Sequence, residues 1–212
     1  MNEGFWKNSV YWLAQISVTI WLKIRMRFES HGSQNVPLKG GCILAANHSS
    51  FLDPPVVGCG LNHRIVHFMA RDSLYKPGFM RWFLLQLKTF PIDRNKGDVA
   101  ALRKAITFLR EGKVVALFPE GTRSSDGNLQ EAKGGIGFLI AKAAVPVVPT
   151  YIDGTFRALP RGAKKIMRSR IRIIYGKPIT LEEMSQFGSD RSAYEQLGNL
   201  VMSRIASLKP LD

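Results

Sequence analysis

Short apolar runs alternate along the chain with longer segments in which apolar and polar residues follow a helical period. Continuous short apolar runs are typical of buried strands, whereas apolar positions that recur every three or four residues predict helices. Strands are expected at 26–30, 42–46, 64–70, 89–94, 113–118, 145–152 and 170–176, and helices from 54 and at 78–87, 98–112, 132–144 and 180–208. This alternation predicts an α/β fold in which helices cover a mixed, mainly parallel sheet.

The N-terminal residues 1–27 are expected to form a separate segment before an α/β domain at 28–212. Their uncharged run from Asn8 to Leu22 would span about 22 Å as a helix, less than the roughly 30 Å of a bilayer core. On a helical wheel, polar residues oppose apolar ones: Asn8, Gln15, Thr19 and Lys23 against Trp6, Val10, Leu13, Ile20, Trp21 and Ile24. An apolar stripe bordered by tryptophan predicts an amphipathic helix in a membrane interface; a helix packed on its own domain and a true membrane span are the alternatives.

The formal net charge is +14, and it is unevenly distributed. Residues 149–178 carry eight basic residues against one acid, Asp153: Arg157, Arg161, Lys164, Lys165, Arg168, Arg170, Arg172 and Lys177. Such a segment favours polyanionic partners, which include nucleic acid, an anionic membrane and an acidic carrier protein. The aromatic residues gather in the N-terminal segment and do not alternate with these cations, so nucleic acid is not the expected partner.

No metal site is expected. Cys42 and Cys59 lack the spacing of metal ligands and lie in apolar context, so they are expected to be buried free thiols. His63 and His67 fall in a predicted strand, where four residues separate them by about 13 Å.

The stretch "AANHSSFLDPP" at 45–55 places a histidine and a carboxylate at the end of a predicted strand. His48 and Asp53 would share a face on neither a helix nor a strand, so only a turn brings them together. Asp53 before Pro54 is expected to be the N-cap of the next helix. A carboxylate bonded to one imidazole nitrogen lets the other nitrogen accept a proton from a hydroxyl. A purely structural histidine is the alternative.

The stretch "LFPEGTRSSDG" at 117–127 follows the apolar strand 113–118, where a site loop is expected. Gly121 allows a tight turn and close approach of a ligand. Arg123 offers a planar fork for phosphate or carboxylate, and Glu120 could orient it or accept from a hydroxyl. A capped turn with a solvated ion pair is the alternative.

Together, "NHSSFLDP" and "FPEGTRS" resemble the glycerophosphate and lysophosphatidate acyltransferase family. Two weaker blocks occur in the family's order, "FPIDR" (90–94) and "VPVVPTYIDGT" (145–155), and "YGKPI" near 175 also matches. The resemblance implies that His48 is the general base and that Asp53 orients it. It also implies a substrate-binding set formed by Arg94, Glu120, Gly121, Thr122, Arg123 and Lys133. The sequence departs from the family at Lys88, where many relatives have glycine.

The resemblance implies transfer of a fatty acyl group from acyl-ACP or acyl-CoA to the sn-2 hydroxyl of lysophosphatidate, as in a 1-acylglycerol-3-phosphate O-acyltransferase. The acceptor hydroxyl would attack the thioester directly, with no cofactor beyond the acyl thioester. The expected partners are these substrates, an anionic membrane surface and an acyl carrier protein, and the expected location is the cytoplasmic face of the cell membrane. The alternatives are another lipid acceptor (glycerol 3-phosphate, a lysophospholipid or an amino-lipid), a thioesterase, or a basic, non-catalytic membrane- or nucleic-acid-binding protein.

Overall fold

The computed structural model describes residues 8–75, 77–92, 99–133, 135–188 and 190–210, and a single sheet runs through this part of the chain. Its strands lie in the order β1-β7-β6-β2-β5-β3-β4. Their bounds are β1 Glu29–His31, β2 Cys42–Ala46, β3 Val66–Arg71, β4 Thr89–Ile92, β5 Val114–Leu117, β6 Val147–Asp153 and β7 Arg172–Tyr175. All neighbouring strands are parallel except β6 and β7, which are antiparallel. The predicted mixed, mainly parallel α/β sheet is confirmed.

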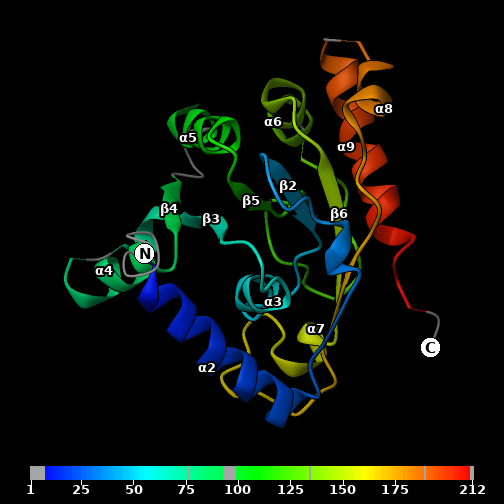
Figure 1. Ribbon diagram of the computed structural model, residues 1–212. Helices are drawn as coiled ribbons and strands as arrows, with labels where there is room; N and C mark the ends of the chain where they lie inside the picture. The colour runs from blue at the N-terminus through cyan, green and yellow to red at the C-terminus, as the bar shows by residue number, and fades with distance from the viewer. Residues whose placement is uncertain (1–7, 76, 93–98, 134, 189, 211–212) are drawn as a thin grey trace.

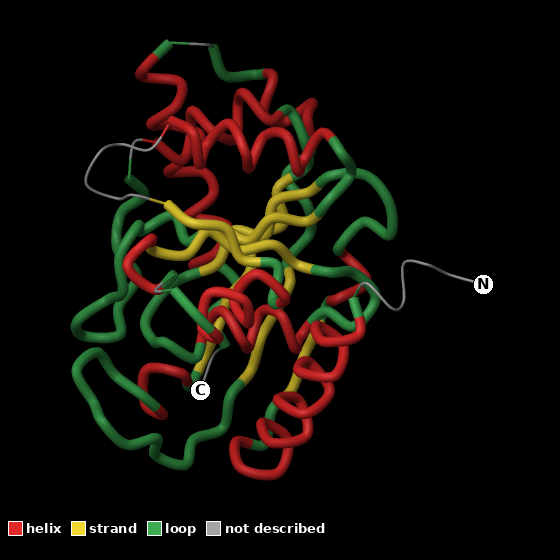
Figure 2. Tube along the Cα trace, turned by 90° about the vertical axis from the view of Figure 1, so that its left-hand side faces the viewer, coloured by secondary structure: helices red, strands yellow, loops and turns green. Residues whose placement is uncertain are grey.

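Helices cover both faces of the sheet (Figure 1). On one face lie α5 (Val99–Arg110), α6 (Gly135–Ala143), α8 (Leu181–Ser185) and α9 (Arg191–Ala206). On the other lie α2 (Ser9–Met26), α3 (Asp53–Gly60) and the short α7 (Thr155–Ala158), with α4 (Phe79–Gln86) beside the edge strand β4. Figure 2 shows the strands between these two helical layers.

The core divides into two clusters because side chains of β2 alternate between the faces of the sheet. Leu44 packs with Val56 of α3, whereas Ile43 packs with Leu139 of α6. Every residue of β2 and β5 is buried, which explains why their sequences are apolar without a polar face.

Two predicted elements differ from the structure. The strand expected at 26–30 begins at Glu29, because Arg27 adopts a left-handed conformation (φ 47°) that ends α2 at Met26. The helix expected over 180–208 is two helices, α8 and α9. Thr180 begins α8 with a reciprocal capping box, and the Asp190 side chain caps α9 separately.

The helix α2 packs on α3 through polar as well as apolar side chains. Gln15 Nε2 donates to the carbonyl oxygens of Gly58 and Leu61 at 2.7 and 2.9 Å. Large apolar side chains of α2 are exposed instead: Leu13, Ile16, Ile20, Trp21 and Ile24. Among the described helices, none combines the length and apolar character needed to cross a membrane.

Both cysteines are free and buried, as expected. Burial raises the pKa of the Cys42 thiol to about 11.

Candidate active site

The candidate site lies where β2 ends, at the carboxyl edge of the parallel strands. Asn47, the first residue after β2, donates through Nδ2 to the Ile152 carbonyl at 2.9 Å and accepts from the Ile152 N–H at 2.7 Å. This buried pair of hydrogen bonds ties the end of β2 to β6. His48, one residue later, is therefore held at an edge where open α/β sheets commonly build their sites.

A turn brings His48 and Asp53 together. His48 Nδ1 donates to Asp53 Oδ2 at 2.8 Å, and the same oxygen accepts the backbone N–H groups of Ser49 and Ser50 at 2.7 Å each. Asp53 is fully buried, and the three donors all converge on one oxygen of its side chain. With Nδ1 holding the proton, Nε2 of the neutral imidazole is an acceptor.

The predicted role of Asp53 as a helix N-cap is wrong. The helix α3 begins at Asp53, and Leu52 occupies the N-cap position without a side-chain cap bond. The Asp53 carboxylate faces back to the turn, because the N–H groups of Ser49 and Ser50 and the imidazole converge on it there. The prolines at the start of the helix lack N–H groups that a cap would satisfy.

The loop after β5 makes three contacts with His48, one with its ring and two with its backbone. The Phe118 ring stacks on the imidazole with centroids 4.1 Å apart and planes 21° apart. Glu120 Oε1 accepts the His48 N–H at 2.8 Å, and the Ser124 N–H donates to the His48 carbonyl at 2.8 Å. The backbone and the ring of His48 are thus both fixed by this loop.

Glu120 is almost completely buried, at 1% exposure. Burial raises the pKa of its carboxyl from 4.5 to about 7, which outweighs the hydrogen bond from the His48 N–H. This residue can therefore carry a proton near neutral pH, beside the His48 backbone.

Three more predicted residues come together around the turn at Gly121. Gly121 has φ +66°, which a residue with a side chain rarely adopts, and the Lys133 side chain packs over it where a Cβ would come within 3.0 Å. The Lys133 N–H donates to the Pro119 carbonyl at 2.9 Å. Arg123 lies with its Cζ 3.5 Å from the centre of the Phe51 ring, an ordinary cation–π arrangement.

Thr122, between Gly121 and Arg123, is half-buried in this loop. The structure thus brings together seven of the eight predicted residues, His48, Asp53, Glu120, Gly121, Thr122, Arg123 and Lys133, in two loops and the start of α3. Arg94 lies outside the described residues.

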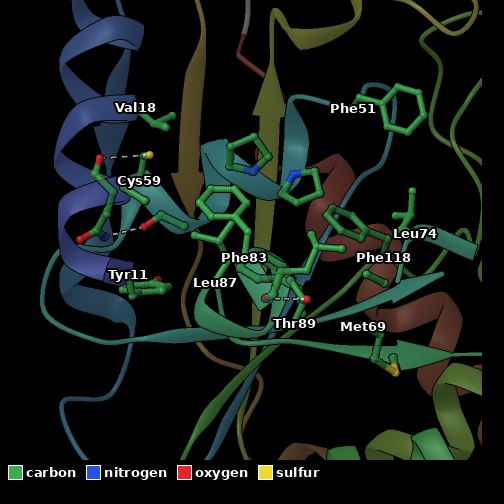
Figure 3. A pocket seen from close by; sticks show the side chains of 18 residues that line it. Tyr11, Val18, Phe51, Cys59, Met69, Leu74, Phe83, Leu87, Thr89 and Phe118 are labelled. Carbon is green, nitrogen blue, oxygen red and sulfur yellow. Dashed lines mark hydrogen bonds between the residues drawn. The ribbon is translucent and has the colours of Figure 1, made fainter. Parts of the chain in front are cut away.

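An apolar cavity of about 380 Å³ adjoins this site (Figure 3). Phe118, which stacks on His48, and Phe51, which contacts Arg123, belong to its lining. The rest of the lining comes from α2, α3, β3, α4, β4 and the segments that flank α4, and includes Tyr11, Val18, Gly58, Cys59, Met69, Phe83, Leu87 and Thr89. These residues could not be recognised as a site from the sequence, because an apolar residue is equally expected in the core.

Lys88 has a positive φ of 59° in the turn between α4 and β4. Glycine adopts this conformation without strain, which gives a backbone reason for the glycine that many relatives carry here. Partial burial and the nearby Lys113 lower the pKa of the Lys88 amine.

A buried histidine–carboxylate pair beside an apolar cavity is suited to deprotonating the hydroxyl of a lipid. The family model described as "Acyltransferase" matches residues 27–153, and the chain belongs to this family.

Several curated relatives share a more specific name. The 1-acyl-sn-glycerol-3-phosphate acyltransferase of Bacillus subtilis is 27% identical over 159 residues, covering 74% of this chain and 76% of the relative. The chloroplastic 1-acyl-sn-glycerol-3-phosphate acyltransferase LPAT1 of Arabidopsis thaliana is 30% identical over 171 residues, covering 78% of this chain but 46% of that longer protein. The crystal structure of the 1-acyl-sn-glycerophosphate (LPA) acyltransferase PlsC of Thermotoga maritima matches with a TM-score of 0.78 and 26% identity, covering 97% of this chain and 80% of that one.

Proposed function

We propose that this acyltransferase moves a fatty acyl group from a thioester to the sn-2 hydroxyl of lysophosphatidate, giving phosphatidate. The hydrogen bond from His48 Nδ1 to Asp53 Oδ2, with Phe118 linking the imidazole to the apolar cavity, is the observation that carries this proposal. The names of the relatives from Bacillus subtilis and Arabidopsis thaliana support the choice of acceptor.

In the proposed reaction, His48 Nε2 takes the proton of the acceptor hydroxyl while its oxygen attacks the thioester carbonyl carbon. Asp53 stabilises the imidazolium that forms. The C–S bond then breaks, and the leaving thiolate takes the proton from His48. A thioester is already activated, so the proposed step requires no covalent enzyme intermediate and no cofactor besides the acyl-ACP or acyl-CoA itself.

The substrate groups are assigned by chemistry. The apolar cavity accommodates the acyl chain of the thioester, because its lining is formed almost entirely by carbon atoms. Arg123 and Lys133 hold the acceptor phosphate at the Gly121 turn, and Arg94 joins them by family resemblance. Fixing the phosphate places the hydroxyl within reach of His48.

We propose further that the enzyme lies on the cytoplasmic face of the cell membrane, where a lipid acceptor and a soluble acyl carrier meet. Residues 1–27 would form the membrane-interface segment and residues 28–212 the acyltransferase domain. The exposed Ile16, Ile20 and Ile24 of α2 support this location, as do Phe79 and Trp82 of α4.

The test is consumption of the thioester by the purified chain in neutral detergent micelles, with and without lysophosphatidate. Wild type is compared with His48→Ala and with His31→Ala, a matched change at an exposed histidine. The proposal expects acceptor-dependent turnover that the His48 change nearly abolishes and the His31 change leaves intact. If turnover occurs only with a different lipid, that lipid and not lysophosphatidate is the acceptor. Turnover without any acceptor would indicate a thioesterase.

A further inference from the structure

A second concave site, of about 330 Å³, lies at the C-terminal end of α2. Its lining is formed by Arg25, Arg27, Arg168, Ser169 and Arg170, which we call the arginine pocket. The loop after α7 passes this end of α2 (Figure 1). Its last part is fixed there because the Ile171 N–H donates to the Met26 carbonyl at 3.0 Å.

The arginine pocket carries excess positive charge. Arg170 forms a two-pronged ion pair with Glu29, in which Nε donates to Oε1 at 3.1 Å and Nη2 donates to Oε2 at 2.9 Å. Arg25, Arg27 and Arg168 form no ion pair with any of the described residues. Proximity to the C-terminus of α2 accounts for one cation, since the helix dipole favours positive charge there. It does not account for three around one concavity, where an anion would relieve their mutual repulsion.

The loop that contributes Arg168 also exposes apolar side chains. Residues 161–168 are all exposed, and Ile166 and Met167 are 44% and 62% exposed. Lys164 and Lys165 precede this pair and Arg168 follows it. The Met167 N–H donates to the Ala158 carbonyl at 2.8 Å, so the loop is fastened to α7 at this point. Exposed apolar residues flanked by cations are typical of segments that enter an anionic membrane interface.

The arginine pocket lies at the C-terminal end of α2, the same helix that carries the exposed apolar stripe. Ile24, the last large apolar residue of that stripe, is 68% exposed and directly precedes Arg25. A bilayer in contact with the stripe would therefore bring its phosphate layer to the arginines. A soluble acidic carrier protein would match their charge but would leave the exposed apolar side chains on the same helix unexplained.

We propose that the arginine pocket and the loop 161–170 bind the phosphate of an anionic phospholipid in the membrane surface. Guanidinium groups match phosphate oxygens in pairs, and Ile166 and Met167 would contact the upper acyl region beside it. This inference rests on the membrane location proposed above and adds the class of lipid that is bound. The lipid bound here is distinct from the acceptor, which lies at His48.

The experiment is co-sedimentation of the full chain with phosphatidylcholine vesicles, with and without about one third phosphatidylglycerol. The test variant is Arg25→Gln/Arg168→Gln. The matched control is Arg103→Gln/Arg191→Gln, which removes the same charge from α5 and α9. Each cation near an anionic surface contributes about fivefold to affinity. Removal of two should therefore lower the affinity of the test variant for the anionic vesicles about thirtyfold. The control should stay within about threefold of wild type, since charges beyond a Debye length are screened.

Thioester turnover in neutral detergent separates this inference from the proposed function, because the test variant should keep the wild-type rate there. An equal loss of vesicle affinity in both double variants, or wild-type anionic preference in the test variant, would overturn the lipid site. A rise in KM for acyl-ACP with unchanged vesicle binding would overturn it too, in favour of a carrier-protein contact. If the wild-type chain shows no thioester turnover but the vesicle result is as expected, the proposed function is overturned and the lipid site is supported.

Discussion

The backbone N–H of His48 donates to Oε1 of Glu120 at 2.8 Å, across 72 positions of the sequence. The Ser124 N–H donates to the carbonyl of the same histidine. The loop after β5 therefore holds the peptide groups on both sides of the His48 Cα, while Asp53 orients the ring. The direction of Nε2 depends on two loops that are distant in sequence, and changes in either should affect the proposed proton transfer.

Replacing Glu120 by Gln should change how the free energy of unfolding varies with pH. The folded pKa of about 7 lies above the ordinary 4.5, so the stability that protonated Glu120 contributes is fully present below about pH 4.5. It is lost as the pH rises through 7. Glutamine cannot ionise and does not suffer this loss. The free energy of unfolding of Glu120→Gln should therefore rise by about 1–3 kcal/mol relative to that of wild type as the pH increases through this window. Urea denaturation at pH 5 and pH 8 measures the difference.

The exposed Glu195→Gln on α9 is the control for loss of one carboxylate. A difference between Glu120→Gln and wild type that stays constant from pH 5 to pH 8 would contradict the raised pKa.

Asp53→Asn should lower kcat by about 10² to 10⁴ and leave the KM for lysophosphatidate nearly unchanged. The amide keeps an acceptor for the His48 and Ser49 donors but removes the charge that stabilises the imidazolium. Steady-state thioester consumption gives both constants. A melting curve checks folding, because weakening hydrogen bonds to a buried carboxylate costs about 1–3 kcal/mol. A kcat within threefold of wild type would remove Asp53 from the mechanism.

Arg123→Gln should raise the KM for lysophosphatidate about 10- to 100-fold, because a charge-assisted hydrogen bond to phosphate is lost. The KM for the thioester should be unchanged. Arg123→Lys should restore little, since an amine lacks the planar fork and the face that lies on the Phe51 ring. Equal rises in both KM values would instead indicate that the loop has been distorted.

Gly58→Leu should shift the preferred thioester to a shorter acyl chain. Gly58 is on α3 and lines the apolar cavity, and an added Cβ would make ordinary contacts of 3.8 Å to Phe68 and 3.9 Å to Tyr11. The remaining side-chain carbons would fill space that the acyl chain is proposed to occupy. Turnover of long-chain thioesters should fall about tenfold or more relative to short-chain ones.

A series of thioesters of increasing length measures this preference, with Ser203→Leu on the exposed side of α9 as the control. An unchanged chain-length profile in Gly58→Leu would place the acyl chain outside this cavity.

The strands of the sheet could be predicted from the sequence wherever both faces of a strand are buried. The expected 42–46 strand has the bounds of β2, because its apolar run ends at Ala46 and the polar Asn47 begins the turn. The strand expected at 26–30 was predicted to begin too early. The apolar Met26 and Phe28 extend the hydrophobic pattern across Arg27, where the left-handed backbone ends α2. Hydrophobic pattern records burial, and it does not record the sign of a backbone dihedral.

The site was predictable only within each loop. The turn that joins His48 to Asp53 is local, and the end of the apolar strand and the proline after Asp53 indicated it. The stacking of Phe118 on His48 joins two loops through the parallel pairing of β2 with β5, a register that no single segment contains. The apolar cavity depends similarly on how α2, α3 and α4 meet.

Ile16→Ser/Ile20→Ser should weaken binding to neutral phosphatidylcholine vesicles by about tenfold or more, because two large apolar side chains no longer enter the interface. Both isoleucines are about half exposed, at 56% and 53%, so the folded chain should keep its melting temperature. Detergent-based turnover should also be retained. The control is Leu38→Ser/Leu181→Ser, which removes two exposed leucines outside α2 and should leave vesicle binding unchanged. If both double variants bind as wild type does, the exposed face of α2 is not the membrane contact, and the interface must be sought at α4 or at the loop 161–170.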